Sequence, residues 1–184
     1  KALYWFKKSA EEGDKRGQYK LGYFYDMGLG VPEDDALAVY WYKKAAEQGY
    51  DMAQSNLGGM YEYGEGVAKD VNRALHLYKK AAEQGDARGQ RSLGKMYDIG
   101  RGVPEDDAIA VYWYKKAAEQ GDASGQSSLG TMYLYGEGVA KDYTKAIHWY
   151  KKAAEQGHAS AQNNLASRYF NGEGVAKDVN RAIY

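Results

Sequence analysis

The sequence predicts an all-α protein, a right-handed α/α superhelical solenoid of 36-residue helix-loop-helix repeats. Three observations predict this fold class. The same residues return at a fixed step along the whole chain, each repeat contains two segments with the apolar spacing of a helix, and glycines mark the end of each segment.

The step is clearest in the glycine that ends each AEQG or AEEG string. These glycines stand 36 positions apart, at Gly13, Gly49, Gly85, Gly121 and Gly157. A period of 72 is superimposed, because residues 31–49 return at 103–121 with one change, Leu37 to Ile109. Copies this similar indicate a recent duplication or a designed array, and both alternatives stay open.

The first half of each repeat predicts a helix, over 15–27 in the first copy. Asp14 precedes it as an N-cap candidate, because an Asp side chain can accept hydrogen bonds from the free amides of the first turn. One helical face then follows at the i, i+3, i+4 and i+7 positions, with Gln18, Leu21, Gly22 and Tyr25. Gly28 is placed to end the helix, since glycine readily adopts the left-handed conformation.

The second half predicts a loop over 28–34 and a helix over 35–48, with Asp34 as its N-cap candidate. Its apolar face carries Ala38, Trp41, Tyr42 and Ala45. A helix pair of this size cannot bury its apolar face alone, so neighbouring repeats are expected to stack. Small residues such as Gly22 and Ala46 suit close helix contact.

These bounds predict one solenoid domain over 1–184. It would contain a partial repeat over 1–12, full repeats over 13–48, 49–84, 85–120 and 121–156, and a partial repeat over 157–184. Neither end carries a polar capping helix, which allows a larger parent protein or self-association through the cut ends.

Composition excludes several function classes. Lys plus Arg and Asp plus Glu each number 25, so the formal net charge is zero, which argues against a general nucleic-acid binder or a polybasic membrane-surface protein. The absence of Cys removes disulfides, thiol nucleophiles and thiolate metal sites. No apolar run approaches the roughly 20 residues of a membrane span, so no membrane insertion is expected.

The string from Ala110 to Asp142, AVYWYKKAAEQGDASGQSSLGTMYLYGEGVAKD, resembles the Sel-one-like repeat, a relative of the tetratricopeptide repeat. The resemblance covers the whole chain and includes its Leu-Gly, Met-Tyr and Gly-x-Gly-Val elements. It implies a non-enzymatic scaffold or adaptor without a cofactor, of the kind that assembles complexes in signalling, protein quality control, or bacterial interaction with hosts or rivals. The setting expected from it is a bacterial periplasmic, secreted or host-delivered protein. A cysteine-rich branch is linked to cell-wall-like ligands, and this chain lacks the cysteines of that branch.

Positions that vary between repeats form a second stripe on each first helix, and we call it the variable stripe. Spacings of 3 and 4 place its members on one helical face. The predicted partner-binding residues are Arg16, Tyr19, Lys20, Tyr23, Met52, Asn56, Tyr63, Arg88, Arg91, Lys95, Ser128, Thr131, Tyr135 and Asn164. The stripe also includes Ser55, Ser92 and Ser127.

If first helices line a concave side, the variable stripe forms one groove with Arg, Lys and Tyr in its N-terminal half and Ser, Thr and Asn in its C-terminal half. This predicts a protein or extended peptide partner with an acidic or aromatic end, because Tyr and Arg are frequent anchors. The alternative is neutral drift of solvent-facing positions.

Other motifs favour structural roles. The five GxGV loops lack P-loop spacing and are typical of helix-ending turns. His76 and His148, two repeats apart, are expected about 20 Å from each other, too far to share a metal. The acidic string at Pro32 and its copy at Pro104 favour helix capping over a calcium loop, and the paired lysines favour a solvated face. Leu77 replaces the tryptophan found at the same position of other repeats, which favours a packing role for those rings.

Three functions are therefore compared. The first is a non-enzymatic protein-binding scaffold, the second an enzyme or a binder of small ligands or cell-wall fragments, and the third a self-associating structural module. The sequence contains no nucleophile–base pair, metal cluster or cofactor motif to support the second. Uncapped ends and near-identical repeats suggest the third.

Overall fold

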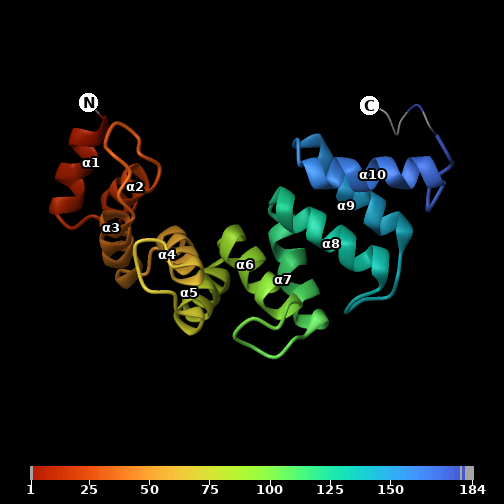
Figure 1. Ribbon diagram of the computed structural model, residues 1–184, viewed down its shortest axis with the longest axis horizontal. Helices are drawn as coiled ribbons and strands as arrows, with labels where there is room; N and C mark the ends of the chain where they lie inside the picture. Colours follow the sequence, from red (N-terminus) through yellow and green to blue (C-terminus); the bar gives the residue numbers. More distant parts are fainter. Residues whose placement is uncertain (1, 179, 181–184) are drawn as a thin grey trace. The chain divides into compact units, whose positions relative to one another are not determined.

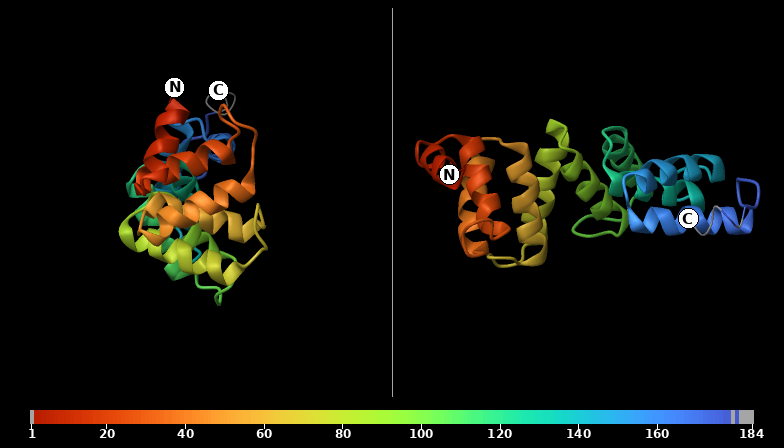
Figure 2. Two further views of the ribbon diagram at one scale, coloured as in Figure 1. Left: turned by 90° about the vertical axis from the view of Figure 1, so that its left-hand side faces the viewer. Right: turned by 90° about the horizontal axis from the view of Figure 1, so that it is seen from above.

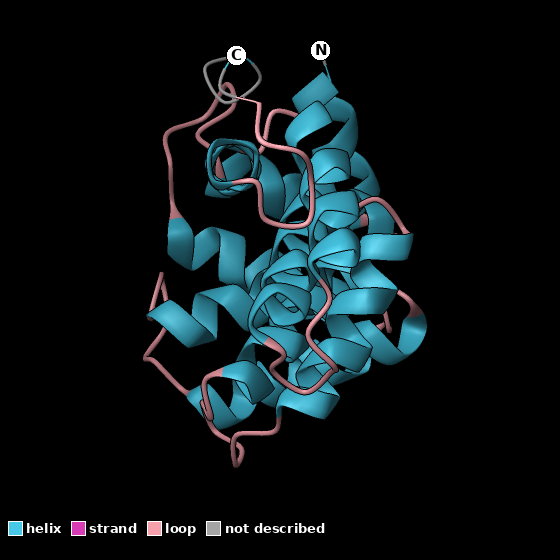
Figure 3. Cartoon of the chain, turned by 90° about the vertical axis from the view of Figure 1, so that its right-hand side faces the viewer, coloured by secondary structure: helices cyan, strands magenta, loops and turns pink. Residues whose placement is uncertain are grey.

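The computed structural model describes residues 2–178 and residue 180, and the regular elements of that part of the chain are α-helices joined by loops (Figures 1 and 3). They are α1 (Ala2–Glu11), α2 (Lys15–Asp26), α3 (Asp35–Glu47), α4 (Asp51–Tyr63), α5 (Val71–Gln84), α6 (Ala87–Asp98), α7 (Asp107–Glu119), α8 (Ala123–Tyr135), α9 (Tyr143–Glu155) and α10 (Ala159–Asn171). The all-α repeat fold is confirmed, and the two helices expected in the first copy each end one residue earlier than predicted.

Side-chain caps start the helices as expected. The Asp14 carboxylate accepts a hydrogen bond from the amide of Gly17 at 2.7 Å, and Asp34 accepts one from the amide of Leu37 at 2.9 Å. In the last complete first helix His158 takes the place of Asp, and its Nδ1 accepts from the amide of Ala161 at 3.3 Å. At these three helices the N-cap supplies an acceptor from either Asp or His, whereas Tyr50, at the start of α4, makes no side-chain cap hydrogen bond.

In the GxGV loops of Gly66 and Gly138 the second glycine has a steric role that the turn alone does not explain, whereas a Cβ at Gly30 of the first loop would meet no neighbouring atom. Gly66 has a φ of +63°, and a Cβ there would overlap the backbone of Asp35 at the start of α3. Gly138 stands in the same relation to Asp107 at the start of α7. These two loops thus lie directly on the preceding second helices, α3 and α7, which brings adjacent repeats into close contact there.

The helices group into two compact units, Lys1–Leu93 and Gly94–Tyr184. In the first unit α1 to α5 pack in succession, side by side (Figure 2). In the second unit α7 to α10 do the same. The boundary falls within α6, whose Gly89 lies against Ala81 of α5 and whose Gly94 lies against Tyr114 of α7.

Tyrosine and alanine form the core of both units. Tyr42, Tyr114 and Tyr150 are fully buried, together with alanines at the neighbouring positions of the second helices. Each ring lies on a glycine of the first helix in the same repeat, as Tyr42 does on Gly22. Small first-helix residues therefore permit the close helix contact that the sequence predicted.

Paired glutamines connect successive repeats inside the units. The Gln54 side-chain amide donates to the carbonyl of Ala46 at 3.2 Å, near the end of α3, and its oxygen accepts from Gln84 at 2.7 Å. Gln126 makes the same two bonds, to Ala118 at 3.1 Å and from Gln156 at 2.8 Å. The same two carbonyls also accept the amides of Gly49 and Gly121 in the helix-ending turns, so the glutamines add a side-chain link between the end of one second helix and the next repeat.

None of the described helices has the length and apolar character needed to cross a bilayer. The described residues also contain no group of three or more His, Cys, Asp or Glu side chains that could hold a metal ion.

Candidate functional site

Four of the predicted partner-binding residues meet around one hollow in the first unit. Tyr19 of α2, Met52 and Asn56 of α4 and Arg88 of α6 line a cavity of about 150 Å³, together with Ser55 and Asp86. These residues come from three successive first helices. We call this group the Tyr19–Arg88 cluster.

A chain of hydrogen bonds connects this cluster to the core. Arg88 Nη1 donates to Asn56 Oδ1 at 2.6 Å, Asn56 Nδ2 donates to the Tyr42 hydroxyl at 2.9 Å, and that hydroxyl donates to Asp26 Oδ2 at 2.8 Å. The four residues lie on four different helices. Because Tyr42 is fully buried, the chain ties an exposed guanidinium to the interior of the unit.

The protonation state of Tyr42 determines which groups donate and which accept in this series of hydrogen bonds. Burial, together with the hydrogen bond to Asp26, raises the pKa of the Tyr42 phenol well above its usual value. The phenol therefore stays protonated and donates to Asp26, and its oxygen is left to accept from the Asn56 amide. Asn56 then presents its carbonyl oxygen to Arg88, which orients the guanidinium.

Tyr19 is a half-buried ring in an aromatic group. Its centroid lies 5.8 Å from that of Tyr42 and 5.2 Å from that of Tyr50, and the Lys20 ammonium lies 5.6 Å from the Tyr19 centroid. Burial raises the pKa of Tyr19. The ring is thus ordered by its neighbours, as a binding anchor with little rotamer freedom would be.

Asp86 supplies the carboxylate of the cluster and is held by two donors. It caps α6 by accepting from the amide of Gly89 at 2.6 Å, and it also accepts from the Ser55 hydroxyl. Ser55 is 2% exposed and Ser127 is 8% exposed. Spacing places both serines on the variable stripe, but both are buried, so the stripe is not solvent-facing along its whole length.

In the second unit, predicted residues also bond to a core tyrosine. The hydroxyls of Thr131 and Tyr150 lie 3.0 Å apart, and Asn164 also hydrogen-bonds to Tyr150. Leu134 stands where the first repeat has Asp26, so Tyr150 has no carboxylate at that position. Thr131 and Asn164 therefore satisfy a buried phenol, a role that the repeat spacing did not reveal.

None of the fourteen predicted partner-binding residues is fully buried. The exposed ones are Arg16, Lys20, Met52, Tyr63, Arg88, Lys95 and Tyr135, and the half-buried ones are Tyr19, Tyr23, Asn56, Arg91, Ser128, Thr131 and Asn164. Residues up to Arg91 belong to the first unit, and those from Lys95 onward belong to the second.

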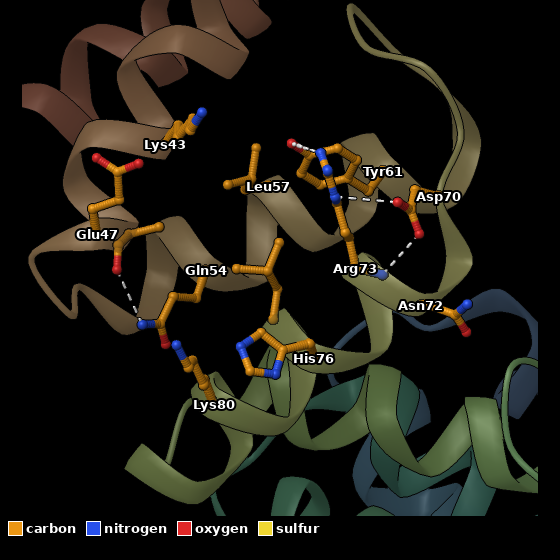
Figure 4. Close-up of a pocket in the computed structure, with 12 residues that line it drawn as sticks. Lys43, Glu47, Gln54, Leu57, Tyr61, Asp70, Asn72, Arg73, His76 and Lys80 are labelled. Carbon is orange, nitrogen blue, oxygen red and sulfur yellow. Dashed lines mark hydrogen bonds and ion pairs between the residues drawn. The ribbon is translucent and has the colours of Figure 1, made fainter.

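A larger cavity, of about 600 Å³, lies elsewhere in the first unit, between α3, α4 and α5 (Figure 4). Leu57 and Tyr61 of α4 and Leu77 of α5 contribute its apolar lining, and Lys43 and Lys80 lie at its rim. One feature of the sequence could have indicated this cavity: Leu77 stands where other repeats have the larger tryptophan. That feature was interpreted as packing and not as a hollow.

Comparison with protein families matches the model of the Sel1 repeat to six consecutive segments, residues 1–14, 15–50, 51–86, 87–122, 123–158 and 159–184. Comparison with curated proteins finds no match.

Solved structures with the same fold include a protective antigen of uropathogenic Escherichia coli strains, described as displaying an SLR fold. It is 44% identical with a TM-score of 0.87 over 98% of this chain and 39% of that one. A Sel1 repeat protein from Oxalobacter formigenes is 39% identical, with a TM-score of 0.91 over 100% of this chain and 75% of that one. An immunity protein from Pseudomonas aeruginosa is 26% identical, with a TM-score of 0.64 over 94% of this chain and 63% of that one. This chain thus spans well under half of the E. coli antigen.

Proposed function

Because the chain belongs to the Sel1 repeat family, whose members are generally protein-interaction scaffolds and typically non-enzymatic, we propose that it binds an extended segment of a partner protein through the variable stripe. Contact would be made by first-helix side chains of several repeats. The observation that carries this proposal is the Tyr19–Arg88 cluster, where stripe residues from three first helices meet around one hollow.

Pre-ordering of the cluster supports a binding role. Arg88 is exposed, yet Asn56 and the buried Tyr42 hold it in one direction. A side chain that is already ordered loses less conformational entropy on binding, so more of its contact energy appears as affinity. Neutral drift of a solvent-facing surface would not require a hydrogen-bond chain across four helices.

Charge around the cluster supports a partner with an acidic or aromatic end. Arg16, Lys20 and Arg88 are exposed on the first helices of the first unit, and Tyr19 offers a half-buried ring beside them. Arg and Tyr are over-represented among the residues that dominate interface energies. A carboxylate next to an aromatic side chain would engage both kinds of group.

The test is capture of a partner by the purified chain, with two matched triple variants. In the first variant Arg88, Arg91 and Lys95 are replaced by Ser. In the control Lys79, Lys115 and Lys151, exposed on second helices, are replaced by Ser, which removes the same charge. A partner retained by the parent and the control but lost by the first variant supports the proposal. Equal retention by all three proteins would exclude this face, and bait particles that grow with concentration while capturing nothing would favour self-association.

A further inference from the structure

The cavity between α3, α4 and α5 is lined by Leu77, at a position where other repeats carry tryptophan. Position 77 corresponds to Trp5, Trp41, Trp113 and Trp149 in the other repeats. Leucine fills less space than an indole ring, and Leu77 lines the cavity of about 600 Å³. That volume lies within the range of about 300–1,000 Å³ found for small-molecule sites.

The copy 72 residues further along shows what fills the same place. There Ala118 and Leu129 belong to a buried cluster against which Tyr133 and Trp149 pack. A shift of 72 positions takes these four residues to Ala46, Leu57, Tyr61 and Leu77. All four line the cavity, so its apolar lining is the set of positions that packs a tryptophan ring in the second unit.

The polar surroundings correspond as well. The Lys145 ammonium lies 5.3 Å from the centroid of the Tyr133 ring, and the Arg73 guanidinium lies 5.5 Å from that of Tyr61. Two copies of one packing arrangement are therefore present, and they differ chiefly in whether position 77 or 149 carries an indole.

The groups that surround Trp149 are also retained around the cavity. The Lys152 ammonium lies 5.0 Å from the Trp149 ring centroid, and His148 meets the same indole edge-on at 5.2 Å between ring centroids. The matching positions are Lys80 and His76, and both line the cavity (Figure 4). An aromatic ring bound in the cavity would thus lie near the Lys80 ammonium and the His76 imidazole.

We propose that this cavity binds the indole ring of a tryptophan carried by an acidic segment of a partner protein, in the place that Trp149 occupies in the second unit. The acidic flanks follow from charge at the rim. Arg73 pairs with Asp70 at 3.2 Å. The other charged lining residues are Lys43, Lys80 and Glu47, which carry two positive charges and one negative charge. An excess of positive charge favours carboxylates beside the ring.

This inference does not rest on the proposed function. The cavity is lined by second-helix residues and by the inward face of α4, and it shares no lining residue with the Tyr19–Arg88 cluster. Failure of either proposal therefore leaves the other standing.

The experiment uses three blocked peptides, DEWED, DELED and KKWKK, titrated into the ¹⁵N-labelled chain and followed by backbone amide shifts. DEWED is expected to shift amides of α4 and α5 around Leu57 and Leu77. DELED should bind about tenfold more weakly, because it lacks the ring. KKWKK should bind about two- to fivefold more weakly, because its charge opposes the rim.

Two reciprocal substitutions locate the site. Leu77→Trp should fill the cavity, abolish the DEWED shifts and leave the melting temperature unchanged or raised. Trp149→Leu should open a matching cavity and add a second set of shifts around Leu129. If Trp149→Leu does not fold, the Leu77→Trp result and the peptide pair still decide the question. Equal binding of DELED and DEWED, or DEWED binding retained by a folded Leu77→Trp variant, would overturn the proposal.

Discussion

Gly58 of α4 lies directly against the ring of Tyr78 of α5. A Cβ at position 58 would be 2.7 Å from Cε1 of that ring, closer than real side chains approach. The same relation joins Gly22 to Tyr42, Gly94 to Tyr114 and Gly130 to Tyr150. Glycine in a helix interior costs about 1 kcal/mol relative to alanine, and close seating of a buried ring explains why it recurs there.

Adjacent glycines of α4 allow this explanation to be tested. Gly58→Ala should lower the free energy of unfolding by about 1–3 kcal/mol, because the ring of Tyr78 must move to admit the methyl group. At Gly59 a Cβ would meet only the Tyr78 hydroxyl, at 3.7 Å. Gly59→Ala should therefore be neutral or stabilising by up to about 1 kcal/mol. Urea unfolding measures both, and equal effects would show that the Tyr78 contact does not explain the glycine.

The hydrogen-bond chain through Tyr42 should contribute to stability. Tyr42→Phe leaves the Asn56 amide and the Asp26 carboxylate without their shared partner, which should cost about 1–3 kcal/mol. Tyr40→Phe is the matched control, since Tyr40 lies two residues away and is 48% exposed. It should change the free energy of unfolding by less than about 0.5 kcal/mol. Thermal melts followed by circular dichroism compare the two variants. An unchanged melting temperature for Tyr42→Phe would show that these hydrogen bonds do not contribute to stability.

Stability should fall at alkaline pH. Burial and a neighbouring carboxylate raise the pKa of Tyr42 and of Tyr78 well above the usual value for a free phenol. A pKa raised on folding means that the folded state favours the protonated phenol, so this stability is fully present below the unfolded pKa of about 10 and is lost as the pH rises above it.

The measurement is the urea midpoint between neutral and strongly alkaline pH, for the parent and for Tyr78→Phe. The midpoint of the parent should hold up to about pH 10 and then decline. The variant should decline less steeply, because lysine titration is common to both proteins and the buried phenol is not. Parallel declines would show that Tyr78 ionises as easily in the folded chain as in the unfolded one.

Stacking depends on the repeated leucine of the first helices. Leu93 is 2% exposed, and Leu93→Ala should cost about 2–5 kcal/mol, as large-to-small changes in a core usually do. Leu37→Ala is the control, because Leu37 is 39% exposed and should lose far less. Calorimetric melts of both variants measure the difference, and similar melting temperatures would contradict a core role for Leu93.

The sequence predicted the helices closely because many of their boundaries have a local cause. Asp14 and Asp34 accept amide hydrogen bonds at the first turns, and glycines such as Gly64 adopt the left-handed conformation at the ends. Capping and periodicity depend on neighbours within a few positions, so one sequence suffices to identify them.

Which residues of the variable stripe bond to buried groups, and which remain exposed, could not be predicted in the same way. Spacing places Asn56 and Thr131 on the stripe, but it does not show that the hydroxyls of Tyr42 and Tyr150, 14 positions before and 19 positions after, reach them. Nor does it show that Ser55 turns inward to Asp86. These are contacts between helices, and they depend on crossing geometry that the repeat pattern leaves open.

The central claim, partner binding through the variable stripe, is tested most directly by affinity. We would titrate the captured partner into the parent, into the variant with Arg88, Arg91 and Lys95 replaced by Ser, and into the variant with Lys79, Lys115 and Lys151 replaced by Ser. Loss of three charged side chains, of which Arg88 and Lys95 are exposed and Arg91 is half-buried, should weaken binding by roughly tenfold, while the control stays within about twofold. Equal affinity for the parent and the first variant, with helicity intact, would contradict the claim.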